Sequence, residues 1–180
     1  SRLTFGKNIK MLMRAFELYR DRGGEWGLLI VGTGPQEREL MDVAPSHISE
    51  SICFYGWAAY DDIPSLYRGA SCFILPSLSE TWGLVVNEAM ATGLPVLLSR
   101  KCGCLPDLCR TGENGFDFDP NNHEELAGLM LKMSSDEINL ASMRIASKKI
   151  ISNYTPETWA NTIVEMVETL SKKMSWDKTA

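Results

Sequence analysis

Short apolar runs alternate with helical patterns along the chain. Runs of strand length lie at residues 26–31, 51–55 and 72–75, and Pro95 opens a further strand. Helical spacing appears between and after them, at residues 36–43, 61–68, 83–92, 123–133, 136–151 and 157–170. A polar opening leads into the first helix, which begins near Gly6 or Asn8 and has an apolar stripe of Ile9, Leu12, Phe16 and Tyr19. The alternation of strands with helices predicts an α/β fold.

Residues 72–99 form the centre of this pattern. An apolar strand is followed by a loop of turn formers, a helix that Gly93 ends, and a second strand. Such a unit favours two parallel strands joined by a right-handed crossover. Ligands of parallel sheets bind at the carboxyl ends of the strands, and a helix N-terminus attracts phosphate. We therefore expect a binding site at the loop from Ser77 to Trp82.

Two glutamates mark this unit, Glu80 in the loop and Glu88 in the helix. At about 1.5 Å of rise per residue, their backbones lie roughly 10 Å or more apart. That separation suits one elongated ligand contacted at two places better than a hydrolytic carboxylate pair, whose carboxyl groups stand about 5 to 9.5 Å apart. The spacing alone nevertheless favours two ordinary acids, with Glu80 stabilised by the helix dipole and Glu88 solvated.

The residues around the glutamates resemble a known family. S-E-T-W-G-L-V-V-N-E-A-M-A-T-G-L-P-V is similar to the E-x7-E segment of the retaining glycosyltransferases of family 4, which have the GT-B fold. The match includes both glutamates, the small residue after each, and Gly83, Ala91, Gly93 and Pro95. The likeness implies a doubly wound, mostly parallel sheet flanked by helices, which is the Rossmann-like half of a GT-B fold. Residues 1–180 would then be a single domain, the C-terminal donor-binding half of an enzyme whose N-terminal acceptor domain is absent here.

The resemblance also implies roles for individual residues. Glu80 contacts the transferred sugar and is the catalytic residue, whereas Glu88 contacts the ribose hydroxyls. Arg2 and Lys7 neutralise the donor diphosphate, although both also fit ordinary surface cations. The remaining donor-binding positions are Gly32, Gly34, Trp57, Ala58, Thr81, Trp82, Gly83 and Leu84. Tight turns explain the two glycines of the G-T-G-P sequence equally well, and the Trp57 side chain could simply be packed.

Other features narrow the alternatives. The third glycine of a dinucleotide fingerprint is missing after G-T-G-P, because position 37 is Glu, so an NAD oxidoreductase is disfavoured. A net charge of −5 argues against a nucleic-acid partner. No apolar run approaches the roughly 18 residues of a membrane helix, and no signal peptide opens the chain, so we expect a soluble, unprocessed protein.

The five cysteines are an odd number without the spacing of a disulfide framework, which fits a reducing compartment. Cys53 and Cys72 lie in strand-like runs and are expected in the core. Cys102, Cys104 and Cys109 raise the question of zinc, but a fourth ligand is lacking, and we expect no metal. In the related enzymes a glycine is usual at position 104 and a glutamate at position 107; Cys104 and Asp107 depart from that pattern.

These observations lead to one principal function and two alternatives. We expect the donor-binding domain of a retaining hexosyltransferase, with a UDP-sugar as the leading donor and a glycan or lipid-linked acceptor. The alternatives are half of a nucleotide-sugar epimerase and a catalytically inactive binding module. The expected partners are the nucleotide sugar and the protein's own acceptor domain, with no cofactor. We expect a cytoplasmic protein that could associate peripherally with the inner face of a membrane through the acceptor domain.

Overall fold

The computed structural model describes residues 2–176, with side chains as far as Lys172. All of the strand pairs in these residues are parallel. They form two sheets, one ordered β1-β2 and the other β3-β4-β5. The strands are β1 (Leu28–Val31), β2 (Ile52–Gly56), β3 (Phe73–Leu75), β4 (Val96–Ser99) and β5 (Gly115–Phe118). The predicted α/β class and the parallel pairing of the central unit are confirmed, and the sheet is divided between β1 and β3.

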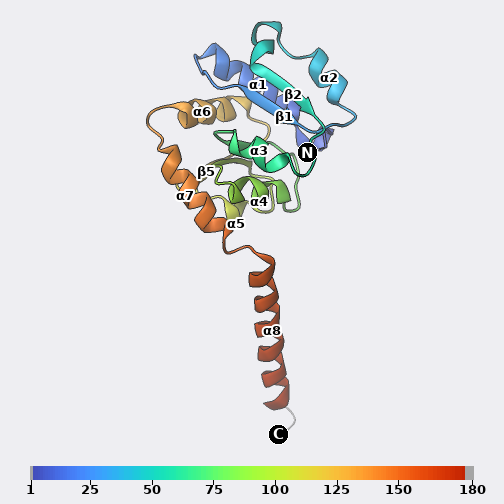
Figure 1. Ribbon diagram of the computed structural model, residues 1–180, viewed down its shortest axis with the longest axis vertical. Coiled ribbons are helices and arrows are strands. Elements are labelled where there is room, and N and C mark those ends of the chain that lie inside the picture. The colour runs from blue at the N-terminus through green and yellow to red at the C-terminus, as the bar shows by residue number, and fades with distance from the viewer. Residues whose placement is uncertain (1, 177–180) are drawn as a thin grey trace.

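Helices cover both sheets and make the connections between strands (Figure 1). A 3-10 turn at Phe5–Lys7 precedes the first helix, and another at Ser46–Ser51 precedes β2. The α-helices are α1 (Ile9–Asp21), α2 (Glu37–Asp42), α3 (Ile63–Arg68), α4 (Leu84–Ala91), α5 (Leu105–Leu108), α6 (His123–Ser134), α7 (Leu140–Ile151) and α8 (Pro156–Trp176).

Three sequence predictions need correction. The helix expected from residue 136 begins at Leu140, because the Asn139 side chain accepts a hydrogen bond from the Ser142 amide and caps the helix there. The helix expected at residues 36–43 is shorter, because Gln36 is the N-cap of α2 and Val43 is its C-cap. Cys53 is exposed on β2 and not in the core, and Cys72 is half-buried.

The buried side chains form two clusters. The larger one lies around α1, whose predicted stripe from Ile9 to Tyr19 is buried, and it includes residues of β1, β2, β5 and α6. The smaller one lies beneath α4 and α5 and includes Cys102 and Cys104. Tyr19 holds the connection between α1 and β1, because its hydroxyl accepts a hydrogen bond of 2.8 Å from the Trp26 amide. This hydrogen bond fixes the chain just before β1 begins.

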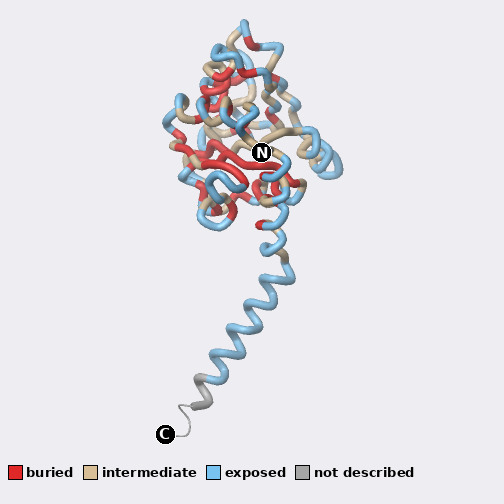
Figure 2. Tube along the Cα trace, turned by 90° about the vertical axis from the view of Figure 1, so that its left-hand side faces the viewer, coloured by how far each residue is buried: buried red, intermediate tan, exposed pale blue. Residues whose placement is uncertain are grey.

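The last helix, α8, extends away from this body (Figure 1), and Figure 2 shows it exposed along its described length. Its apolar stripe includes Trp159, which is 70% exposed, and Met166, which is 59% exposed. An apolar stripe on a helix is typical of packing against a core, yet the whole described stripe of α8 is exposed. Within residues 2–176, none of the helices has the length and apolarity that crossing a bilayer requires.

Candidate functional site

The loop after β3 is fixed by backbone pairing with the loop after β4. The Glu80 amide donates to the Lys101 carbonyl at 3.1 Å, and the Gly103 amide donates to the Glu80 carbonyl at 2.8 Å. A side chain at Gly103 would not fit, because a Cβ atom there would lie 2.0 Å from the Thr81 carbonyl oxygen. The backbone therefore sets the position of Glu80 at the carboxyl end of β3.

The N-terminal segment brings Lys7 to this loop. Asn8 adopts the left-handed conformation, and its side-chain amide donates to the carbonyls of Pro76 at 3.2 Å and Pro120 at 2.8 Å. The Leu78 amide donates to the Gly6 carbonyl at 2.9 Å. These bonds hold the Lys7 turn against two loops at the same edge of the sheet.

Lys7 and Glu80 form an ion pair in this position. Their side chains are 24% and 19% exposed, so solvent screens the pair only in part. The buried Ser77 hydroxyl donates to the same Glu80 oxygen at 3.4 Å. The site thus holds a cation and a carboxylate that neutralise each other.

The start of α4 lies directly beyond Glu80. Gly83 is its N-cap, with a φ of 93° that favours glycine, and Thr81 and Leu84 are exposed beside it. The Trp82 indole donates to the Asn87 side chain at 2.9 Å, and its ring lies 6.2 Å from that of Tyr154. Trp82 therefore packs along the helix, while the amides at the N-terminus of α4 face the loop region with their partial positive charge.

Glu88 has different surroundings on α4. It is exposed, and its carboxylate accepts a hydrogen bond of 3.1 Å from the Tyr67 hydroxyl of α3. Burial, the nearby charge of Glu88 and this hydrogen bond raise the pKa of Tyr67, so the hydroxyl remains a donor at neutral pH. The Tyr67 ring packs edge-on against Phe73 at 5.8 Å. Tyr67 thus connects Glu88 to the start of β3.

The remaining predicted residues gather at a second place on the same edge. A cavity of about 590 Å³ is lined by Arg2, Gly32, Gly34, Trp57 and Ala58, together with neighbours from β1 and α3. The Trp57 side chain is 74% exposed at its rim. Gly34 is also required by packing, because a Cβ atom there would lie 2.3 Å from the Leu3 carbonyl oxygen. The structure therefore brings together the residues that follow β1 and β2 with the exposed Arg2.

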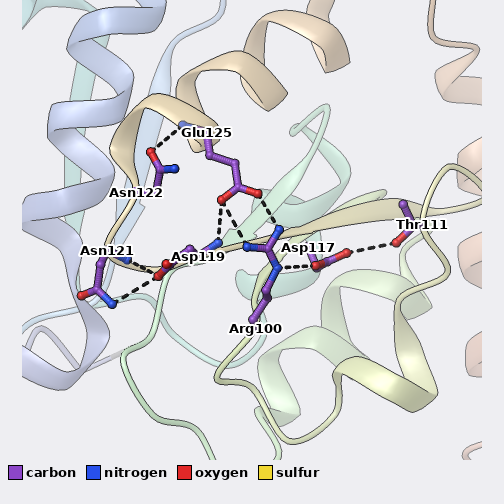
Figure 3. Close-up of polar contacts among 7 residues, drawn as sticks. All are labelled: Arg100, Thr111, Asp117, Asp119, Asn121, Asn122 and Glu125. Atoms are coloured by element: carbon purple, nitrogen blue, oxygen red, sulfur yellow. Dashed lines mark hydrogen bonds and ion pairs between the residues drawn. The ribbon is translucent and has the colours of Figure 1, made fainter.

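A polar network supports the loop after β4 (Figure 3). The Arg100 guanidinium donates to Asp117 at 2.7 Å and also pairs with Glu125 of α6. Burial opposes the charge of Asp117, yet Arg100 and the Thr111 hydroxyl lower the pKa of Asp117 below its usual value. Glu125 also accepts a hydrogen bond from the Asp119 amide at 2.9 Å. These contacts fix the first residue of the segment that carries Gly103.

The cysteines of this segment are neutral thiols. Burial raises the pKa of Cys102 to about 12, with further contributions from Cys104 and Glu80, and burial raises the pKa of Cys104 to about 11. A thiol with such a pKa is a poor nucleophile and a poor metal ligand. Among the described residues, no group of three His, Cys, Asp or Glu side chains is arranged to hold a metal ion.

Sequence reasoning missed four residues that position the site: Asn8, Tyr67, Ser77 and Gly103. Ser77 contacts Glu80 three positions away, whereas the other three act through contacts between distant parts of the chain. Asn8, for example, reaches a carbonyl 112 positions away. The pattern G-K-N before the first helix was a signal for Asn8, since asparagine tolerates the left-handed conformation. No comparable local signal identifies Tyr67.

Comparison with known proteins defines the class of this arrangement. The complex of Anabaena Alr3699/HepE with UDP superposes with a TM-score of 0.76 at 26% identity, over 96% of this chain and 47% of that one. A parallel α/β domain with this site is the donor-binding half of a GT-B glycosyltransferase. The family described as "Glycosyl transferases group 1" matches residues 1–150, and the chain belongs to that family.

Two curated relatives agree with this assignment. An uncharacterized glycosyltransferase of Haemophilus influenzae is 33% identical over 136 residues, which are 74% of this chain and 38% of that protein. The amylovoran biosynthesis glycosyltransferase AmsK of Erwinia amylovora is 25% identical over 179 residues, covering 95% of this chain and 44% of AmsK. The chain thus spans less than half the length of these relatives.

Proposed function

We propose that this domain binds the nucleotide-sugar donor of a retaining hexosyltransferase, with a UDP-sugar as the leading donor. The observation that carries the proposal is the meeting of Lys7, Glu80 and the N-terminus of α4 at the carboxyl end of β3. A diphosphate needs positive charge from several directions, and a sugar needs a carboxylate that orients its hydroxyls. Structures of the HepE relative with UDP and with UDP-glucose support the choice of donor.

In this proposal, the Lys7–Glu80 ion pair is broken when the donor binds. Glycosyl transfer breaks the bond between the anomeric carbon and the diphosphate, and negative charge collects on the departing oxygen. Lys7, Arg2 and the amides of α4 stabilise that charge without a metal ion. When the diphosphate binds, the Lys7 ammonium turns to it from Glu80, and the Glu80 carboxylate becomes free to accept hydrogen bonds from the sugar.

Two other parts of the site bind the ribose and the base of the donor. Glu88, oriented by Tyr67, accepts hydrogen bonds from the ribose hydroxyls. The cavity beside Trp57 and Ala58 takes the base, with Gly32 and Gly34 allowing close approach of the backbone. The acceptor belongs to the part of the enzyme outside this chain, so the isolated domain should bind donor and transfer nothing.

Calorimetric titration with UDP, GDP and ADP tests the proposal. We expect UDP to bind with a Kd between about 10 μM and 1 mM, which is about −4 to −7 kcal/mol, and equally well with magnesium or with a chelator. Affinity that appears only with a divalent metal would contradict the charge assignment. If the whole protein binds the donor and transfers no sugar, the inactive-module alternative replaces the transferase.

A further inference from the structure

Four loops meet at the ion pair of the candidate site, and hydrogen bonds join them in a ring. The loop after β3 is bonded to the N-terminal turn, because the Leu78 amide donates to the Gly6 carbonyl. The same loop is bonded to the loop after β4 through the backbone of Glu80. The N-terminal turn is bonded to the loop after β5, because the Asn8 side chain donates to the Pro120 carbonyl. A connection between the loops after β4 and β5 closes the ring.

Arg100 makes that connection. Its amide donates to the Phe118 carbonyl at 2.8 Å, where the pairing of β4 with β5 reaches the two loops. Its guanidinium donates to Asp117 at 2.7 Å, and two of its nitrogens donate to the two carboxylate oxygens of Glu125 at 2.5 and 3.3 Å (Figure 3). A bidentate pair of this kind fixes the direction of a carboxylate as well as its distance.

Glu125 extends this order into the loop after β5. One of its carboxylate oxygens accepts a hydrogen bond of 2.9 Å from the amide of Asp119, the residue directly before Pro120. At the other end of the loop, the Asn122 side chain accepts a hydrogen bond of 3.1 Å from the Glu125 amide. Glu125 thus holds both ends of the loop whose Pro120 carbonyl binds Asn8.

Asn8 connects the place of this loop to the place of Lys7. Its amide donates to the Phe5 carbonyl at 3.0 Å and closes the turn that contains Lys7. Its side chain donates to two carbonyls, that of Pro76 at 3.2 Å and that of Pro120 at 2.8 Å. The shorter of these bonds is the one to the loop after β5. The position of the Lys7 turn therefore depends on that loop.

Solvent reaches the Arg100 network, so the network defines position more than it adds stability. The Arg100 side chain is 46% exposed, and that of Glu125 is 27% exposed. An ion pair this open to water adds little to the free energy of unfolding, whereas a bidentate pair within a network still fixes geometry. We therefore expect changes in this network to be seen at Lys7 more clearly than in the Tm.

We propose that Arg100 and Glu125 are positioning residues of the donor site. They hold the loop after β5 in the place from which it binds Asn8, and they thereby set the position of the Lys7 ammonium against its carboxylate partner. Both act through Lys7. The consequence for donor binding rests on the proposed function, whereas the consequence for the loops rests on the fold alone.

Two neighbouring glutamates of α6 provide a matched pair of variants. Glu125→Ala removes the carboxylate that joins Arg100 to the loop after β5. Glu124→Ala removes a carboxylate from the same helical turn, and this one pairs with Arg22 of α1. Each change costs the first turn of α6 one negative charge and breaks one ion pair with an arginine. A difference between the two variants therefore reports on the position of the loop.

Hydrogen exchange of the complete protein, followed by mass spectrometry, tests the structural consequence. In Glu125→Ala, segments 4–8 and 119–122 should exchange at least about fivefold faster than in the wild type. In Glu124→Ala these segments should exchange like the wild type, and segment 28–31 should be unchanged in both variants. Equal exchange of segment 4–8 in the two variants would overturn the proposal. Faster exchange confined to segment 119–122 would also overturn it, because the turn that contains Lys7 would then be unaffected.

Titration of UDP into the complete protein tests the consequence for the donor. Glu125→Ala should weaken UDP binding about three- to tenfold and should add nothing in a Lys7→Ala background, because both changes act on one contact. Additive losses would overturn the positioning role. Glu125→Gln keeps one oxygen that can accept from Arg100 and from the Asp119 amide, so it should recover part of the affinity. Without any recovery, the charge alone would explain the loss, and the positioning role would be wrong.

A failure of the proposed function gives a different result. A wild-type protein that binds no UDP would contradict that function, and the exchange of segment 4–8 would still decide whether Glu125 positions the turn that contains Lys7.

Asn8→Gly cuts the same connection at its other end, and it decides the matter if Glu125→Ala does not fold. Glycine readily adopts the left-handed conformation of this residue, so the change removes the side-chain bonds to Pro76 and Pro120 and keeps the backbone. Asn8→Gly should weaken UDP binding at least as much as Glu125→Ala, and it should speed the exchange of segment 4–8. UDP affinity and exchange equal to those of the wild type would overturn the proposal.

Discussion

Glu80 and Glu88 lie only eight positions apart, but different parts of the structure hold them. Glu80 is in a loop whose backbone is bonded to the loop after β4, and its side chain is mostly enclosed with Lys7 and Ser77. Glu88 is exposed on a helix, and its carboxylate accepts a hydrogen bond from Tyr67. The backbone therefore positions the first carboxylate, and a neighbouring side chain orients the second.

This difference predicts that the two halves of the donor can be disturbed separately. Changes that move the loop should affect the sugar, and changes at Tyr67 should affect the nucleotide. The same comparison explains why the E-x7-E spacing is informative although the glutamates share no contact partner: each end of an elongated ligand needs its own support.

The largest expected effect comes from Gly103→Ala. The new Cβ atom must displace the Thr81 carbonyl, and overpacking of this kind costs about 1 to 3 kcal/mol in the free energy of unfolding. Because the displaced loop carries Glu80, the variant should also lose its preference for UDP-sugar over UDP. Denaturant unfolding and calorimetric titration measure the two effects.

Gly128→Ala is the matched control for that change. Gly128 lies in α6 with no atom within 4 Å of a Cβ, and alanine is favoured over glycine in a helix by about 1 kcal/mol. It should be neutral or stabilising and leave binding unchanged. Equal stability of the Gly103 and Gly128 variants would show that the loop is not held as described.

The next largest effect is expected from Lys7→Ala. If the ammonium moves from Glu80 to the diphosphate, its loss should weaken UDP binding by about 1.5 to 3 kcal/mol, the usual contribution of a hydrogen bond to a charged group. Lys10→Ala is the control, because Lys10 is an exposed lysine of the following helix that pairs with Glu39. Isothermal titration at low salt compares the UDP affinities of the two variants. Identical affinities would show that Lys7 does not contact the diphosphate.

A smaller effect is expected from Tyr67→Phe. The change removes the hydrogen bond to Glu88 and keeps the ring that packs on Phe73, so UDP binding should weaken by about 0.5 to 1.5 kcal/mol. In the Glu88→Ala background the same change should have little further effect, because the two residues act through one interaction. Additive losses in this double-mutant cycle would contradict an orienting role for Tyr67.

The smallest effect concerns the thiol beneath the loop. Because burial raises the pKa of Cys102 to about 12, its thiolate fraction, and with it the rate of alkylation, should rise about tenfold per pH unit from pH 7 to 9 without a plateau. Cys53 is exposed and should react first. Saturating UDP-sugar should slow the Cys102 reaction further, since the bound sugar holds the Glu80 loop over this thiol. Equal rates for Cys53 and Cys102 would show that the loop is open.

The sequence predicted the elements well where periodicity was strong. The α1 stripe and the parallel pair β3-β4 agree with the structure, and α4 begins one residue after the expected start at Gly83, because burial on one face leaves a regular signal. The start of α7 was placed four residues too early, because a single capping side chain decided it. Cys53 was wrongly expected in the core, because position in an apolar run does not say which face of a strand is covered.

The candidate site could be predicted as a set of positions but not as a set of contacts. The family resemblance indicated Glu80 and Glu88 from the E-x7-E segment and Lys7 from the opening of the chain, and the structure brings Lys7 to Glu80. The pairing itself depends on Asn8 bonding to loops after β3 and β5, which only the folded chain brings together. The partition of the sheet between β1 and β3 likewise has no signal in the printed sequence.

The most direct test of the account is titration of UDP and a UDP-sugar into Glu80→Ala and Glu88→Ala, with Glu137→Ala as an exposed control. Glu88→Ala should weaken both ligands alike, by about 1 to 3 kcal/mol, because the ribose hydroxyls lose their acceptor. Glu80→Ala should spare or strengthen UDP binding, since Lys7 is then released, and should abolish the preference for UDP-sugar. Affinities equal to those of the control in both variants would contradict the account and show that the two glutamates are ordinary surface acids. The reverse pattern would show that the sugar and ribose assignments are exchanged.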